Sequence, residues 1–236
     1  MSVGSQEGQT KTGSRTVAKV LALIRPLLAL LAAGMLIISG GLDWPMAWAY
    51  IGVVAVGSVV QVLVTDSGLL AERMSFKAGV KRWDIAFAIF VGRIGPIAIL
   101  ITAWMDKQAG WSPQIPLPAQ IAALVIVALS FSFIIWAMVV NRFFSAMVRI
   151  QRDRGHTVVA IGPYAVVRHP GYVGIIVYIL ATSPALGSVW ALVPAGITAI
   201  VCIIRTALED RMLQNELEGY KEYAGRVRYR LLPGVW

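Results

Sequence analysis

The residues best suited to chemistry lie in one polar stretch, residues 149–172, which reads RIQRDRGHTVVAIGPYAVVRHPGY and separates two long apolar parts of the chain. It places two imidazoles, His156 and His169, beside several arginines, a Gly-Pro-Tyr turn and a Pro-Gly break. Two histidines alone make a poor metal site, although Glu209 or Asp210 could complete one. We therefore expect this stretch to bind a small molecule without a metal ion.

A second candidate is the pair Arg205 and Glu209, which lie four residues apart at the end of the last apolar run. On a helix this spacing puts both side chains on one face. The structural alternative is an intrahelical ion pair with a snorkelling arginine. In the order Arg before Glu, however, that pair would contribute only about 0.3 kcal/mol. We therefore expect the two side chains to hold a ligand.

These residues belong to a longer pattern: Gly162-Pro163-Tyr164, then Arg168-His169-Pro170-Gly171-Tyr172 with Gly174, then Arg205-x-x-x-Glu209-Asp210 and Tyr220-x-x-Tyr223. The pattern resembles the isoprenylcysteine carboxyl methyltransferase superfamily, whose membrane methyltransferase core is shared by phospholipid N-methyltransferases and bacterial thiol S-methyltransferases. The resemblance extends from about Asn141 to the C-terminus. One departure is Asp210, which stands where the family usually has Glu.

The resemblance implies S-adenosylmethionine as methyl donor, with S-adenosylhomocysteine as product. It assigns cofactor binding to the loop before the RHPxY motif, to the motif itself and to the first acidic residue after the hairpin: Gln151, His156, Thr157, Val158, Val159, Tyr164, His169, Pro170, Gly171, Tyr172 and Glu209. It gives Arg205 the catalytic and substrate-binding role of orienting the acceptor's carboxylate. The chemistry agrees, because a cationic cofactor with an adenine is suited to a carboxylate and aromatic faces.

The methyl acceptor stays open between a carboxylate, a thiol and a phospholipid amine. An anionic carboxylate or thiolate attacks a methyl sulfonium without a general base, so that catalysis rests on alignment and the exclusion of water. An amine would have to lose a proton, for which the sequence offers only a histidine or an acidic residue near Glu209.

The composition indicates an integral membrane protein. Of 236 residues, 58% are hydrophobic and 14% are charged, and the mean hydropathy is +0.72, which is too apolar for a soluble domain. The net charge of +9 does not indicate nucleic acid, because the basic residues alternate with apolar runs and form no patch with aromatics. The single cysteine, Cys202, lies in an apolar run, which predicts a small buried hydrophobic side chain.

The apolar runs predict an all-α, polytopic fold. Four runs are long enough to span about 30 Å of hydrocarbon: Val20–Gly40, Trp44–Val64, Ile85–Trp104 and Ile121–Val140. Two shorter runs, Val173–Ala185 and Val189–Ile204, predict a tilted or re-entrant hairpin, giving five to six spans in effect. An amphipathic cytosolic helix should continue from Leu208 and stop at Gly225.

We divide the chain into a disordered cytosolic tail (1–18), N-terminal transmembrane helices (19–140) and a methyltransferase core (141–236). Lys and Arg concentrate in the N-terminal tail, the loop after the second run, the polar stretch and the C-terminal tail. The positive-inside rule then predicts that both termini and the polar stretch lie on the cytosolic side of the cell membrane.

Two alternatives come from other classes of protein. A transporter would need polar residues within several spans, and the clear candidate is Arg93, which has no acidic partner at comparable depth in the sequence. Arg93 could instead contact a lipid headgroup or the anionic end of a substrate. A membrane scaffold that keeps the fold without the activity is the other alternative, and cofactor binding would distinguish it from an enzyme.

Overall fold

The computed structural model describes residues 24, 31, 34, 43–74 and 78–236. The predicted tail 1–18 and nearly all of the predicted span Val20–Gly40 lie outside these residues. The α-helices of the described part are α2 (Pro45–Val64), α3 (Ser67–Met74), α4 (Arg82–Ile89), α5 (Gly95–Ala109), α6 (Leu117–Val140), α7 (Pro170–Ala185), α8 (Leu192–Glu216) and α9 (Tyr220–Arg226). A π-helical turn, η1 (Phe90–Ile94), joins α4 to α5, and the polar loop carries two 3₁₀ turns, η2 (Arg152–Arg154) and η3 (Gly162–Ala165).

Four helical segments of the described part are long and apolar enough to cross a membrane: Pro45–Val64, Arg82–Ala109, Leu117–Val140 and Leu192–Glu216. The shorter apolar helix α7 packs against α6 and α8. Residues 43–74 and 78–236 contain no strand. The all-α, multi-pass membrane fold expected from the sequence is confirmed, and so are the predicted runs at 44–64, 85–104 and 121–140.

The last long helix differs from its prediction. The run Val189–Ile204 was expected to be too short to cross by itself, with an amphipathic helix continuing from Leu208. The helix α8 does continue past Ile204, without a break to Glu216, and is long and apolar enough to cross a membrane. It continues because its polar residues are paired inside the protein: Arg205 binds Asp84, and Asp210 binds Arg168. The chain then breaks at Gly219, whose φ of 76° is left-handed, and Gly225 lies inside α9 instead of ending the helix.

The helices approach closely where glycine leaves room. A Cβ on Gly174 of α7 would lie 2.5 Å from Cγ1 of Ile134 in α6, and one on Gly95 of α5 would lie 2.3 Å from Oγ1 of Thr198 in α8. Small residues at helix contacts are the usual way for membrane helices to pack without a hydrophobic driving force. These contacts bring α5, α6, α7 and α8 into one bundle.

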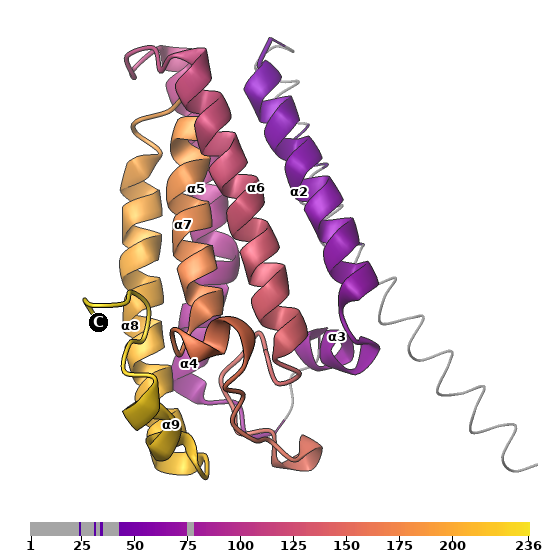
Figure 1. Cartoon of the computed structure of the whole chain (residues 1–236). Coiled ribbons are helices and arrows are strands. Elements are labelled where there is room, and N and C mark those ends of the chain that lie inside the picture. Colours follow the sequence, from indigo (N-terminus) through magenta and orange to yellow (C-terminus); the bar gives the residue numbers. More distant parts are fainter. Residues whose placement is uncertain (1–23, 25–30, 32–33, 35–42, 75–77) are drawn as a thin grey trace, which may run out of the picture.

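The connections gather at two ends of the bundle (Figure 1). One end carries α3, the polar loop after α6, and α9, so the described part of the basic loop after α2 and the basic polar stretch share this end. At the opposite end the turn after α5 and the turn between α7 and α8 meet, because Ser112 and Ser188 both donate hydrogen bonds to the Asp106 carboxylate. The functional residues predicted from the sequence therefore lie together at one end of the bundle.

Candidate active site

A cavity of about 430 Å³ opens where the polar loop meets the helix ends. That volume is in the range of small-molecule sites, about 300–1,000 Å³. Its polar part is formed by the loop residues 143–149 and 156–159 and by Tyr164, Arg168 and His169, together with Tyr172, Arg205 and Glu209. Its apolar wall lies among the spans and includes Ala88, Val91, Pro96, Phe131, Ile134, Ile175 and Ile179.

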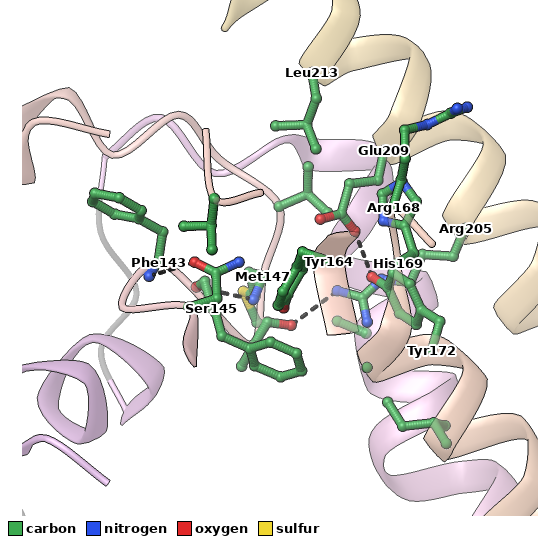
Figure 2. A pocket seen from close by; sticks show the side chains of 18 of the residues that line it. Phe143, Ser145, Met147, Tyr164, Arg168, His169, Tyr172, Arg205, Glu209 and Leu213 are labelled. Atoms are coloured by element: carbon green, nitrogen blue, oxygen red, sulfur yellow. Dashed lines mark hydrogen bonds between the residues drawn. The ribbon is translucent and has the colours of Figure 1, made fainter. Parts of the chain in front are cut away.

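Glu209 presents its carboxylate to this cavity. The Tyr172 hydroxyl donates a hydrogen bond of 2.5 Å to Oε2 of Glu209, and the two side chains meet in Figure 2 on the side opposite Phe143 and Ser145. Tyr172 belongs to the first turn of α7, which begins at Pro170, and Glu209 to the C-terminal half of α8. The RHPxY motif and the acidic residue after the hairpin are thus joined by a direct contact.

Arg205 lies one turn from Glu209, but its ion-pair partner is Asp84. Nε and Nη2 of Arg205 donate to the two Asp84 oxygens at 2.6 and 2.9 Å, and Nη2 also donates to the Ala146 carbonyl. Asp84 is fully buried and accepts a further hydrogen bond from the Val148 N–H at 2.7 Å. The pair therefore ties α4 and α8 to the cavity loop.

Asp210 serves a different purpose from its neighbour Glu209. Its buried carboxylate binds the Arg168 guanidinium in bidentate fashion, at 2.7 and 2.9 Å, and accepts hydrogen bonds from Arg230, Gln214 and Tyr220. Arg168 and His169 also donate their backbone N–H groups to carbonyls of the C-terminal tail. Asp210 does not line the cavity, so it anchors the motif and the tail around the site.

Each of the two histidines is held by a polar contact. His156 accepts the Gln151 N–H on Nδ1, and its ring centroid lies 4.4 Å from that of Phe143. Burial, followed by the charges of Arg149, Arg154 and Arg142, lowers its pKa to about 4. Nε2 of His169 lies 3.3 Å from Oδ1 of Asp210. Within residues 43–74 and 78–236, no three His, Cys, Asp or Glu side chains are grouped to hold a metal.

The structure brings most of the predicted site residues to one cavity. The lining includes His156, Thr157, Val158, Val159, Tyr164, His169, Gly171, Tyr172, Arg205 and Glu209. Gln151 and Pro170 are outside it: Gln151 is fully buried, donates to the Phe143 carbonyl and accepts from Arg154. Sequence reasoning missed Asp84, because the one signal available was an isolated carboxylate at the start of an apolar run.

The cavity suits S-adenosylmethionine by its donor set. Glu209 supplies a carboxylate that can accept from the amino group, and the rings of Tyr164, Tyr172 and Phe143 supply faces for the adenine or the sulfonium. Tyr164 is held in place by the Tyr223 hydroxyl, which donates to the Tyr164 carbonyl at 2.6 Å. Burial raises the pKa of Tyr164, so its hydroxyl stays neutral.

Residues 121–215 match the model of the isoprenylcysteine carboxyl methyltransferase (ICMT) family. The matched residues include most of α6, the polar loop, α7 and nearly all of α8. Enzymes of the ICMT family use S-adenosylmethionine as methyl donor.

Among solved structures, the chain is similar to one described as the eukaryotic intramembrane Ras methyltransferase ICMT without a monobody. The two sequences are 17% identical, the match covers 95% of this chain and 94% of that chain, and the TM-score is 0.49. No curated protein sequence matches the chain.

Proposed function

We propose that the chain methylates the carboxylate of a lipophilic, isoprenylcysteine-like acceptor that enters from the membrane. The observation that carries this proposal is the continuity of one cavity from the Glu209 carboxylate to an apolar wall made by residues of α4, η1, α5, α6 and α7. A soluble acceptor would not need a wall among the spanning helices. A lipophilic one can keep its tail among Val91, Ile134 and Ile175 while its head reaches the polar part.

In this proposal Glu209, Tyr172 and the loop residues 156–159 hold S-adenosylmethionine. Bound there, the cofactor supplies a methyl group on a sulfonium: the acceptor oxygen forms a bond to the methyl carbon, the S–CH₃ bond breaks, and its electron pair stays on sulfur. Tyr172 orients the Glu209 carboxylate through its hydroxyl.

The described titratable groups favour a carboxylate over an amine. A carboxylate is already anionic at neutral pH, whereas an amine must give up a proton to a base. His156 is a poor base because its pKa is lowered to about 4 and its Nδ1 already accepts a hydrogen bond. Nε2 of His169 already lies within hydrogen-bond distance of Asp210 and Tyr220, so this nitrogen is engaged within the protein.

Arg205 has a narrower role in this proposal than the one that the resemblance implies. Its charge is compensated by Asp84, but it lines the cavity, and within the described part of the chain no hydrogen bond is made by its Nη1 atom. We assign to Nη1 a contact that orients the acceptor's reacting oxygen. The basic loops at this end of the bundle support a cytosolic position for the site, by the positive-inside rule.

Transfer of a tritiated methyl group distinguishes the possible acceptors. Membranes containing the protein are incubated with S-adenosyl-[methyl-³H]methionine, extracted into organic solvent and treated with alkali. A methyl ester releases volatile [³H]methanol, whereas S-methyl and N-methyl products keep their label. We expect alkali-labile counts in the lipid extract that are absent from membranes without the protein. Alkali-stable counts would reject the carboxylate, and no transfer together with no S-adenosylhomocysteine binding would favour a scaffold.

A further inference from the structure

Arg73 is a cavity residue that the function described above does not use. It lies in the last turn of α3 and is half-buried, and it lines the same cavity as Glu209 and Tyr172. Its Nη1 donates to the Phe144 carbonyl at 3.2 Å, and its guanidinium carbon lies 5.4 Å from the centroid of the Phe144 ring. The guanidinium is therefore held at a fixed place with donors to spare.

Arg73 differs from the other arginines of the cavity in its charge partners. Arg149, Arg168 and Arg205 each form an ion pair with a buried carboxylate, from Glu72, Asp210 and Asp84 respectively. For Arg73, no Asp or Glu oxygen of the described residues lies within ion-pair distance.

The surroundings of Arg73 disfavour its charge. Burial, and after it the charge of Arg205, lowers the pKa of Arg73 to about 10. The side chain still carries its proton at neutral pH. A partly buried cation without a counter-ion carries some of this desolvation cost, and an anionic ligand in the cavity would reduce it.

The cavity thus offers charges of opposite sign at two places. The Glu209 carboxylate faces it from α8 and suits a cationic ligand, whereas the Arg73 guanidinium faces it from α3 and suits an anionic one. Two ligands that must react with each other can be aligned in this way. The apolar wall that includes Ala88 and Val91 belongs to the same cavity.

We propose that Arg73 binds the anionic carboxylate of the methyl acceptor, which makes a lipophilic carboxylic acid the substrate class of this site. The inference rests on the proposed function and assigns the acceptor's main electrostatic contact to Arg73. Arg205, whose charge Asp84 compensates, then orients a single oxygen.

Protection of the wild-type protein tests this directly. The protein in detergent is saturated with S-adenosylhomocysteine and treated with phenylglyoxal, which modifies arginines, in the presence of dodecanoate or of dodecanol. Dodecanoate at about ten times its Kd leaves roughly one site in ten free, so it should slow the modification of Arg73 about tenfold. Dodecanol should not. Arg82, an exposed arginine outside the cavity, is the internal control and should react at the same rate throughout.

Variants supply the second measurement. Dodecanoate should raise the Tm of the wild-type complex more than dodecanol does, and Arg73→Gln should abolish that difference, whereas Arg73→Lys keeps part of it and Arg82→Gln keeps all of it. The affinity for S-adenosylhomocysteine should stay within about twofold of wild type in each variant, since neither Arg73 nor Arg82 is among the residues proposed to hold the cofactor. If dodecanoate gives no protection, or Arg73→Gln keeps the preference, Arg73 is not the acceptor site. Failure of the wild type to bind S-adenosylhomocysteine would instead reject the proposed function.

Discussion

Replacing Asp84 by Asn should destabilise the protein more than any surface substitution. Asp84 has no exposed surface, and its carboxylate takes three hydrogen bonds, two from Arg205 and one from the Val148 N–H. The amide keeps one acceptor for Val148 but removes the charge. Arg205, with 8% of its side chain exposed, is then left as a buried cation without a counter-ion.

The cost follows from burial. Removing one partner of a buried ion pair costs about 3–5 kcal/mol, because the other charge stays desolvated. For a chain of this size that corresponds to a lowering of Tm by about 6 to 20 °C. Asp153→Asn is the matched control, since Asp153 pairs with Arg149 but is 50% exposed, and a solvent-exposed pair contributes at most about 1 kcal/mol.

The assay is the Tm of the protein in detergent, read by size-exclusion chromatography after heating. The double variant Asp84→Asn with Arg205→Gln removes both charges and should recover most of the loss, so the two substitutions should be strongly non-additive. Additive losses, or an Asp84→Asn variant as stable as Asp153→Asn, would show that Asp84 and Arg205 are not a buried pair in the protein.

Three further predictions concern orientation, packing and pH. In a Cys202→Ser background, a cysteine at Gln108 should react with an impermeant maleimide from outside the cell and one at Arg152 should not; the reverse pattern would invert the proposed topology. Gly171→Val should prevent S-adenosylhomocysteine binding without preventing membrane insertion, since a Cβ there would meet an aromatic ring of the cavity loop at 2.4 Å; retained affinity would refute the close approach. Burial lowers the pKa of His156 to about 4, so this imidazole takes up a proton in the unfolded chain at a higher pH than in the folded protein. Tm should therefore fall as pH drops from about 6.5 to about 4, and His156→Gln should flatten that fall. A pH profile that His156→Gln leaves unchanged would mean that His156 is solvated.

The fold was predictable where it depends on apolar length. The runs at 44–64, 85–104 and 121–140 became helices because an apolar segment of spanning length satisfies its backbone only as a helix. The continuation of the last long helix past Ile204 was predicted from the periodicity after Leu208, but the contacts of Arg205 and Asp210 within that helix were not. Their partners, Asp84 and Arg168, are 121 and 42 residues away in the chain, and sequence spacing gives no measure of such contacts.

The candidate site was partly predictable, because several of its residues are close in sequence. Residues of the loop and of the RHPxY motif are close in sequence, and Glu209 follows one turn after Arg205, so local geometry was enough to group them. Asp84 and Arg73 belong to a segment that carries no motif, and only the packing of α3 and α4 against the loop brings them to the site. The separation of Glu209 from Asp210 likewise needs the structure, because neighbours on a helix point in different directions.

Binding of S-adenosylhomocysteine by the purified protein tests the central claim most directly. Isothermal titration in detergent should give saturable binding to the wild type, and Glu209→Gln should weaken it by about 1.5 to 3 kcal/mol, roughly 10-fold to 150-fold in Kd. Glu218→Gln, the same change at an exposed residue outside the cavity, should leave Kd within about twofold of wild type, as expected for a surface substitution. No binding to the wild type, or equal affinities for the two variants, would contradict a cofactor site at Glu209.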